Sequence, residues 1–378
     1  MPAMYDWDLV IVGAGPAGAS AAIAARQSEP RARVLLLDAA SFPRDKVCGD
    51  GVAPHALDVL ARLGVDSNEL VAGSDPVTRL RLRSPGGSTA TRLLARPAYV
   101  VPRLIFDDRL VRAATGAGAV FEQRAVRSIT VLADAVLLDD QIRARTLIGA
   151  DGSESIVRRL SGASRPPMGT VALALRGYAS ADPWPAGEQL LTMTSKHWPA
   201  YAWAFPIGNG VANVGYGELL QGAPSSRAHM MSRLHELLPD AVPGSLRGHR
   251  LPLSTGRPKL ASGPVLLAGD AASLINPLTG EGIFYAVLSG SLAGAAALTP
   301  HPARTYRHAL RLALGRHLRH TDALARLGHW PALLDAAISA ARDAQPVFDS
   351  LVEIGLGAGL LRRRAATAVA RRIVRPGS

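Results

Sequence analysis

The sequence predicts an α/β fold, in which a Rossmann-type nucleotide-binding domain carries an inserted antiparallel β-sheet and ends in a helical segment. Three observations predict it. Residues 8–38 read as a strand, a glycine-rich turn, a small-residue helix and a second strand. Segments 147–158 and 265–283 each show an apolar strand that ends at an acid, followed by a turn and a helix start. Strand-like alternation lies between them, and residues 301–378 have a helical, Arg-rich pattern.

The nucleotide-binding feature of the first unit is the turn Gly13–Gly18, which matches the G-x-G-x-x-G pattern. The first glycine of this pattern allows a tight turn, the second lets a pyrophosphate approach the backbone, and the third lets the helix pack closely on the sheet. The helix N-terminus offers N–H groups and a positive dipole end to phosphates. Asp38 ends the second strand, where it can accept hydrogen bonds from a ribose. The unit predicts a dinucleotide site, with a glycine-rich packing turn as the alternative.

The composition excludes several other classes of protein. Hydrophobic residues make up 48% of the 378-residue chain, which provides ample core material and excludes full disorder. The single cysteine, Cys48, excludes a disulfide framework and a cysteine-rich metal site. The formal net charge is +12, yet the arginines are scattered and aromatic residues are only 5%, so we expect no nucleic-acid partner. A solvated basic surface is the simplest explanation, and attraction to an anionic membrane or an acidic cofactor is the alternative.

The sequence also predicts a cytoplasmic protein without a membrane-spanning segment. The longest small, apolar stretch, 286–298, is shorter than the roughly 18 residues that a span needs. Residues 9–25 resemble a signal peptide in their apolar content but lack a basic region ahead of them. The arginines at 362–364 and 371–372 lie on an Ala-rich tail. This tail is either a solvated helix or a peripheral contact with a membrane.

Two later motifs indicate which nucleotide is bound. Asp151-Gly152 follows one apolar strand, and Gly269-Asp270 leads on to Gly280-Glu281-Gly282-Ile283. In this order and spacing they resemble the motifs of the flavoprotein monooxygenase and geranylgeranyl reductase superfamily, which shares the fold of para-hydroxybenzoate hydroxylase. The resemblance spans residues 8–285 and implies bound FAD. It places Asp270 near the ribityl chain and the helix start at 280–283 at the pyrimidine end of the flavin, where a helix dipole can stabilise negative charge.

Three segments are similar to the geranylgeranyl reductase family in particular. They are Phe42–Gly51, Tyr201–Pro206 with that family's Y-x-W-x-F-P pattern, and Pro277–Ile283, where hydroxylases more often carry Pro-x-Gly-Gly-Gln-Gly. The family reduces C=C bonds of prenyl chains with FAD. The resemblance therefore implies a reductase that acts on a hydrophobic substrate.

The resemblance puts Cys48 and Gly49 in a turn beside the flavin ring. Three alternative roles are then open to Cys48. It packs beside the ring, it takes part in proton delivery or redox chemistry, or it forms a covalent link to the flavin. Asp50 is the better candidate for a polar group near the ring, and an Asx turn or a helix cap is its alternative. Cys48 and Asp50 are therefore the catalytic candidates.

Further cofactor contacts follow from the resemblance. The superfamily places an arginine at the position of Arg103 against the flavin phosphate or ribityl chain, and a surface arginine at a helix start is the alternative. Arg44 is either a phosphate or ribose contact or a surface charge. Residues 120–129 read as a strand, and the resemblance implies that the backbone of Val126 within this strand meets the adenine. The predicted FAD contacts are Gly13, Gly15, Pro16, Ala17, Gly18, Asp38, Arg44, Cys48, Gly49, Arg103, Val126, Asp151, Gly152, Gly269, Asp270, Gly280, Glu281, Gly282 and Ile283. We predict no metal ligand.

Alternating strand patterns at 77–83 and 211–216 predict the substrate sheet. Tyr201, Trp203 and Phe205 also alternate, so on a strand they face one side. They form either core or the aromatic wall of a substrate pocket, which would suit a long apolar or aromatic substrate. We predict an FAD-binding domain over 1–75, 97–165 and 260–330, a substrate domain over 76–96 and 166–259, and a C-terminal helical segment over 331–378.

The leading functional hypothesis is an FAD-dependent oxidoreductase that reduces C=C bonds of an isoprenoid-type substrate. The alternative is an FAD-dependent monooxygenase that hydroxylates an aromatic or polyketide-type compound with NAD(P)H and O2, and a non-catalytic FAD-binding protein is a third reading. We expect non-covalent FAD. No second complete βαβ unit is visible, so the reductant is NAD(P)H bound transiently or a protein electron donor. The sequence leaves the substrate and the oligomeric state open.

Overall fold

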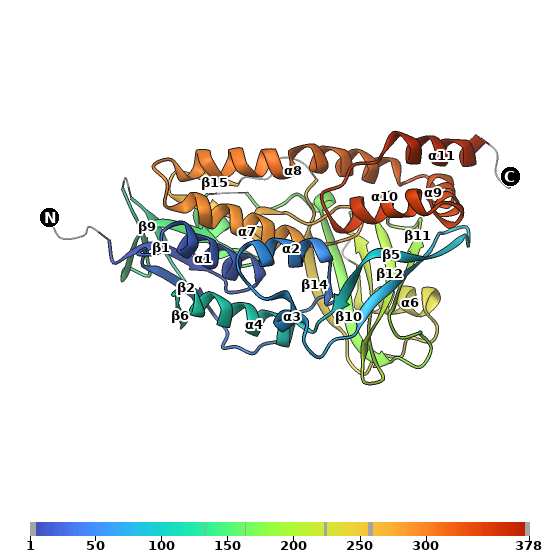
Figure 1. Cartoon of the computed structure of the whole chain (residues 1–378), viewed down its shortest axis with the longest axis horizontal. Coiled ribbons are helices and arrows are strands. Elements are labelled where there is room, and N and C mark those ends of the chain that lie inside the picture. The colour runs from blue at the N-terminus through green and yellow to red at the C-terminus, as the bar shows by residue number, and fades with distance from the viewer. Residues whose placement is uncertain (1–4, 133, 163, 223–224, 256–259, 375–378) are drawn as a thin grey trace.

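The computed structural model describes residues 5–132, 134–162, 164–222, 225–255 and 260–374. Two eight-stranded sheets lie beside each other along the long axis of the molecule, and helices cover them (Figure 1). The first described residues lie at the end of the first sheet, and the last described helix lies at the end of the second (Figure 1).

The first sheet has a parallel centre. Its order is β15-β16-β9-β1-β2-β6, and the β7–β8 hairpin extends from β9. The apolar runs in β1 and β2 are buried along most of their length, as expected of strands covered on both faces. The parallel strands are β1 (Trp7–Val12), β2 (Val34–Asp38), β6 (Val120–Gln123), β9 (Ile142–Gly149) and β16 (Val265–Leu267); β7 (Ile129–Val131), β8 (Val136–Leu138) and β15 (Ala261–Ser262) are antiparallel to their neighbours.

Helices α1 (Pro16–Ser28) and α7 (Ile283–Ala297) pack closely against each other beside this sheet. Two glycines of α7 make this approach feasible. A Cβ on Gly290 would lie 2.0 Å from the carbonyl oxygen of Ala17, and a Cβ on Gly294 would lie 2.1 Å from that of Ala21. The remaining helices around this sheet are α2 (Pro54–Arg62), α3 (Ser67–Val71), α4 (Arg103–Gly116), α5 (Ile156–Leu160) and α8 (Pro302–Leu327), with a 3-10 turn at Gly269–Ala272.

The second sheet is antiparallel except for the pair β4–β11. Its order is β14-β10-β13-β12-β11-β4-β5-β3. Along β12, Ala200, Ala202 and Ala204 pack under helix α6 (Arg227–Leu237), whereas the residues between them point to the other face. The strands are β3 (Gly51–Val52), β4 (Pro76–Arg83), β5 (Thr89–Val100), β10 (Val171–Ser180), β11 (Glu188–Thr194), β12 (Ala200–Gly208), β13 (Val211–Leu219) and β14 (Arg247–Pro252), and a 3-10 turn at Met168–Thr170 precedes β10.

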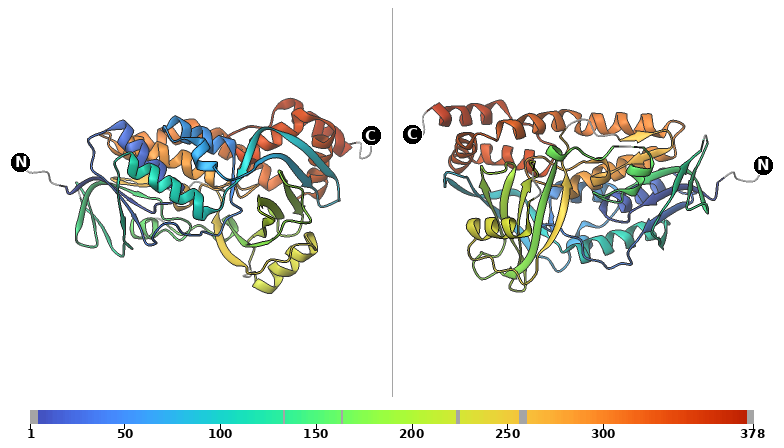
Figure 2. Two further views of the ribbon diagram at one scale, coloured as in Figure 1. Left: turned by 60° about the horizontal axis from the view of Figure 1, so that its bottom comes forward. Right: turned by 180° about the vertical axis from the view of Figure 1, so that it is seen from behind.

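The C-terminal helices are α9 (Pro331–Asp343), α10 (Gln345–Leu356) and α11 (Arg363–Val374). They bury apolar side chains against β4 and β5, including Ile338 and Phe348 against Leu80 and Leu82. They lie on the opposite side of the second sheet from α6 (Figure 2). Across the described ranges, no helix combines the length and apolar character that crossing a membrane requires.

This architecture confirms the predicted fold class, a Rossmann-type α/β unit with an antiparallel sheet and a helical C-terminal segment. The predicted strand 120–129 is wrong in extent. Strand β6 ends at Gln123, and Val126 lies in the loop before β7. The second sheet also reaches beyond the predicted ranges 76–96 and 166–259, because β5 continues to Val100 and pairs there with β3.

The α1–α7 contact generates a stability prediction. Gly290→Ala should lower the free energy of unfolding by about 1–3 kcal/mol, because the added methyl would overlap the backbone of α1. Gly116→Ala is the matched control, since nothing lies within 4 Å of a Cβ placed there at the end of α4. Urea unfolding of both variants measures the difference. Equal stability of the two variants would show that α1 and α7 can separate without cost.

Candidate active site

Two adjoining cavities mark the site. We call them the outer groove, which runs past the carboxyl ends of β1, β2 and β9, and the inner cavity, which lies between α7 and the second sheet. The two have five wall residues in common: Pro16, Lys46, His249, Asp270 and Ala286. One elongated ligand can therefore extend from the groove into the cavity. Such a crevice at strand ends is the usual ligand site of open α/β sheets.

The three glycines of the first turn have different neighbours. Gly13 has a φ of +100°, and a Cβ there would lie 2.3 Å from the carbonyl oxygen of Ala150. A Cβ on Gly18 would lie 1.8 Å from the carbonyl oxygen of Gly13. Gly15 differs, because its nearest protein atom, an Arg44 nitrogen, would be 3.6 Å away. Gly13 and Gly18 are thus required by the fold, whereas Gly15 keeps its space free for a ligand.

The start of α1 and the end of β2 suit a nucleotide. No side chain in the described part of the molecule caps α1, whose N-cap residue is Gly15, so its first N–H groups can meet phosphate. Asp38 accepts hydrogen bonds from the N–H groups of Ala14 (2.8 Å) and Ala40 (2.9 Å) through different oxygens. Each carboxylate oxygen retains acceptor capacity for a ribose hydroxyl.

A buried charge cluster lies beside Gly15. Arg103 is only 4% exposed and donates from Nε and Nη2 to the two oxygens of Asp107, both at 2.6 Å. Arg44 donates to the same carboxylate at 3.0 Å. Burial alone would lower the pKa of Arg103, but the Asp107 carboxylate raises it above its usual value. The Nη2 of Arg44 also lies 3.8 Å from Asp38, so two carboxylates balance the two guanidinium groups. Both guanidinium groups lie beside Gly15, where a pyrophosphate could accept hydrogen bonds from them.

Asp151 and Gly152 lie in the wall of the outer groove, at the turn after β9. The Asp151 carboxylate is occupied by the start of α5. It accepts hydrogen bonds from the N–H groups of Ile156 (2.7 Å) and Val157 (3.1 Å) and from the Ser155 hydroxyl (2.5 Å). Asp151 therefore positions the groove wall by capping a helix.

Asp270 lies at the junction of the two cavities. The Lys46 Nζ is 3.4 Å from its Oδ2, and the His249 Nε2 is 3.9 Å away. Burial alone would raise the pKa of Asp270, but Lys46 and His249 lower it well below the usual value. Its backbone is also held, because Arg158 donates to the carbonyl oxygens of Asp270 (3.4 Å) and Ala271 (3.1 Å). The junction thus carries a fixed carboxylate that can accept hydrogen bonds from a polyol.

The start of α7 forms one wall of the inner cavity. Gly280 has a φ of +68°, and Gly282 is the N-cap residue of the helix. The Glu281 carboxyl accepts a hydrogen bond from the N–H of Phe284 at 2.8 Å, so it lies in front of the helix N-terminus. Burial raises the pKa of Glu281 to about 7. The helix therefore presents a carboxyl group to the cavity together with its dipole.

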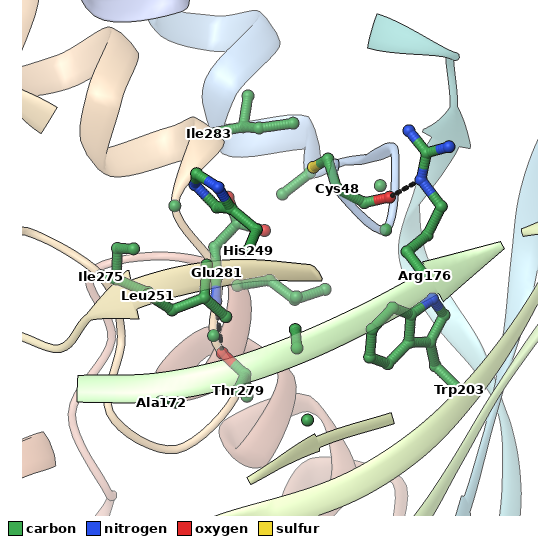
Figure 3. A pocket seen from close by; sticks show the side chains of 18 of the residues that line it. Cys48, Ala172, Arg176, Trp203, His249, Leu251, Ile275, Thr279, Glu281 and Ile283 are labelled. Atoms are coloured by element: carbon green, nitrogen blue, oxygen red, sulfur yellow. Dashed lines mark hydrogen bonds between the residues drawn. The ribbon is translucent and has the colours of Figure 1, made fainter. Parts of the chain in front are cut away.

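The turn Cys48–Asp50 forms the opposite wall and is held by the second sheet. Arg176 of β10 donates to the carbonyl oxygen of Cys48 at 3.1 Å (Figure 3), and Asn213 of β13 donates to the same oxygen at 2.9 Å. Arg176 also donates to Asp45 at 2.7 Å. Burial raises the pKa of the Cys48 thiol although Arg103 lies beside it. The thiol therefore retains its proton at neutral pH.

Asp50 is fully buried behind this turn and lines neither cavity. Its φ is +59°, and its Oδ2 accepts hydrogen bonds from Tyr178 (2.7 Å) and Asn213 (2.8 Å). Its Oδ1 has no partner among the described residues, and burial raises its pKa to about 6. The sequence predicts a polar group near the ring at Asp50. The structure instead directs the carboxyl into the second sheet.

The aromatic residues of β12 line the inner cavity on the face away from α6. The ring centroids of Tyr201 and Trp203 are 6.0 Å apart, and those of Trp203 and Phe205 are 6.5 Å apart. Trp203 donates from Nε1 to Asn213 at 2.8 Å, and a Cβ on Gly215 would overlap its ring at 2.2 Å. Tyr201 donates to the carbonyl oxygen of Thr279 in the loop before α7. The aromatic wall is therefore fixed to both sides of the cavity.

The structure brings most of the predicted site residues together. The outer groove contains Gly13, Gly15, Pro16, Ala17, Asp38, Arg44, Val126, Asp151, Gly152 and Asp270, and the inner cavity contains Cys48, Gly49, Arg103, Tyr201, Trp203, Phe205, Gly280, Glu281, Gly282 and Ile283. Gly18, Gly269 and Asp50 lie outside both walls. Sequence reasoning missed Lys46, His249, Arg176 and Asn213. Lys46 could have been found inside the segment 42–51, but no local pattern marks His249.

Comparison with known proteins agrees with this geometry. The FAD binding domain family matches residues 6–189. The chain is 35% identical to a menaquinone reductase of Mycolicibacterium smegmatis over 76% of its length and 75% of that protein. It is 30% identical to digeranylgeranylglycerophospholipid reductase 2 of Methanopyrus kandleri over 76% of each chain. Its fold matches a geranylgeranyl bacteriochlorophyll reductase-like structure from Thermoplasma acidophilum with a TM-score of 0.77, at 20% identity over 98% and 96% of the two chains.

Fold, cavities and relatives together define an FAD-dependent oxidoreductase. More narrowly, the chain belongs to the geranylgeranyl reductase family of these flavoproteins. Its cofactor is FAD. The free space at Gly15, the uncapped start of α1 and the continuous path from groove to cavity all fit this molecule.

The contrast between two glycines predicts how FAD binding and folding separate. Gly15→Ala should weaken FAD binding by about tenfold or more and leave the stability of the FAD-free protein unchanged, because only ligand space is lost. Gly13→Ala should destabilise the FAD-free protein, because its φ and the Ala150 backbone exclude a side chain. Fluorescence titration with FAD and urea unfolding measure the two effects. A Gly15→Ala protein with unchanged FAD affinity would contradict this assignment.

Proposed function

We propose that the protein reduces carbon–carbon double bonds in the isoprenoid chain of a hydrophobic substrate, with non-covalently bound FAD as the hydride carrier. The observation that carries the proposal is the inner cavity, which continues from the junction at Asp270 into an apolar space between α7 and the second sheet. Menaquinone and digeranylgeranylglycerophospholipid, the compounds named for the relatives, both carry isoprenoid chains. They support this substrate class.

The lining of the inner cavity fits a branched hydrocarbon chain. Towards β4, β5 and β11 the wall includes Leu80, Ala98 and Leu191. Towards β14 it includes Leu251 and Ile275. Small residues such as Ala172 and Ala174 lie between them. Burial of a chain against such a wall is favourable by roughly 0.8 kcal/mol per CH2 group. The aromatic residues of β12 lie between these two apolar parts of the wall. They would position one double bond of the substrate chain for reduction.

Reduced FAD supplies a hydride from its ring when bound. The chain's own residues supply the remaining requirements. The apolar lining excludes water from the double bond, and a proton must come from a group on the cavity wall. The Cys48 thiol and the Glu281 carboxyl line the cavity, and both have raised pKa values. Tyr201 also lines it, but its hydroxyl donates to the carbonyl oxygen of Thr279. The Asp50 carboxyl lies behind the cavity wall, so it would not touch the substrate. It would instead hold the Cys48–Asp50 turn in position.

The electron donor and the approach of the substrate are parts of the same proposal. NAD(P)H in transient contact, or a protein donor, would reduce the flavin. The exposed arginines of α8 and α11, such as Arg311 and Arg364, together with the exposed Ile373 and Val374, would rest against an anionic membrane that holds a lipid substrate.

An anaerobic single turnover tests this function. Protein whose FAD has been reduced with dithionite is mixed with menaquinone, and the product is reoxidised in air before mass spectrometry. Air restores the quinone ring, so a retained gain of two hydrogens reports reduction of the side chain. A menaquinone with a fully hydrogenated side chain is the control and should gain none. A parallel turnover in air, in which the product gains one oxygen atom and no hydrogen, would favour the monooxygenase alternative instead.

Glu281 generates a prediction about pH. With a pKa of about 7 its carboxyl holds a proton below pH 7 and loses it above, so a proton-dependent turnover should fall as pH rises through 7. Glu281→Gln should remove this inflection while the rate of flavin reduction by the donor stays within roughly tenfold. Pre-steady-state rates between pH 5.5 and about 9 measure both steps. The same inflection in wild type and Glu281→Gln would assign the proton to another group, with Cys48 next.

A further inference from the structure

Three side chains with metal-ligating atoms meet at the start of α6. His197, Glu218 and His229 each offer one ligand atom, and these atoms all lie within 4.8 Å of one another. The cluster lies on the face of the second sheet under α6, away from the inner cavity. Glu218 continues the alternation of Val214 and Tyr216, which pack on that face. The cluster is therefore separate from the site described above.

Glu218 supplies a preorganised anionic ligand. It is fully buried, and its carboxylate accepts hydrogen bonds from Tyr216 (2.7 Å), from His229 (3.2 Å) and from the Ser225 hydroxyl. Tyr216 and Ser225 orient the carboxylate in the way that outer partners orient a metal ligand.

The two histidines supply ligands that can be reached from solvent. His229 lies in the first turn of α6, where its N–H donates to Ser226 at 3.1 Å, and its side chain is about one-third exposed. His197 lies exposed in the β11–β12 connection, and the two imidazole rings are 5.5 Å apart at an angle of 71°. Neighbouring ligands of a tetrahedral zinc ion are separated by roughly 3.3 Å. Glu218 and His229 already have this spacing, and an exposed His197 can turn towards them.

We propose that His197, Glu218 and His229 form a zinc-binding site. Two imidazoles and one carboxylate are the ligand types that Zn2+ prefers, whereas Mg2+ and Ca2+ prefer oxygen ligands. Three protein ligands leave a fourth position open to water on the solvent side. The proposal is independent of the reaction at the flavin, because no residue of the cluster lines either cavity.

Metal binding here would act on the wall of the inner cavity. His197 is followed by Trp198 and Pro199, and Pro199 lines that cavity. Trp198 donates from its indole nitrogen to the carbonyl oxygen of Ala325 in α8 at 3.0 Å. An ion that joins His197 to Glu218 and α6 would therefore hold the segment that leads into the aromatic wall. The site would stabilise this wall without taking part in the chemistry.

Isothermal titration of untagged, FAD-loaded protein with zinc chloride tests the proposal. We expect one saturable zinc ion per chain, a rise in melting temperature on binding, and affinity at least about tenfold lower in both His197→Ala and His229→Ala. His197 is exposed, so its variant should fold normally. His235→Ala is the matched control, because His235 is an exposed histidine of the same helix.

A second control separates this site from the flavin cavity. Cys48→Ser removes the single thiol, and that variant should bind zinc as the wild type does. Glu218→Gln keeps the shape of the side chain and removes its charge, and it should weaken binding. Absence of a saturable site in the wild type would overturn the proposal. Equal zinc affinity in His197→Ala, His235→Ala and wild type would also overturn it, and would leave His229–Glu218 as a plain pair that fastens α6 to the sheet.

Discussion

The active site depends on the hydrogen bonds that tie the turn Cys48–Asp50 to the second sheet. Arg176 and Asn213 reach this turn from adjacent strands and converge on one carbonyl oxygen. Asn213 also joins Asp50 to Trp203, so one buried amide links the turn to the aromatic wall. Buried polar groups must be satisfied, and a network of this kind specifies one arrangement. These hydrogen bonds thereby fix the position of the cofactor-binding unit relative to the second sheet, next to the inner cavity.

Charges around the cavities are compensated in pairs, and this keeps the inner space apolar. Asp107 neutralises one of the two guanidinium groups beside Gly15, and Lys46 faces Asp270 at the junction. An isolated buried charge would be too costly, whereas a hydrogen-bonded pair is tolerated. The guanidinium groups lie beside Gly15, where a pyrophosphate could accept hydrogen bonds from them. The groove is thus polar and the cavity apolar, as a ligand with a charged end and a ring end requires.

Local sequence patterns predicted those parts of the structure that depend on residues close together in the sequence. The strand, turn and helix of the first unit follow from glycine positions and apolar runs, and the alternation along β12 placed Tyr201 and Trp203 on one face. Features that depend on distant segments could not be predicted. Asp50 turns into the sheet because Tyr178 and Asn213 lie there, and His249 reaches the junction only through the pairing of β14 with β10. Strand β6 ends early because pairing with β2 stops at Gln123.

A crystal structure of the FAD-loaded protein tests the central claim, that one cofactor extends from the outer groove into the inner cavity. We expect the pyrophosphate beside Gly15 and Arg103, and the flavin ring between the Cys48–Gly49 turn and the start of α7. We also expect that the aromatic wall of β12 remains open beyond the ring for substrate. A flavin ring seated outside the inner cavity, with Cys48 and Glu281 remote from it, would contradict the account.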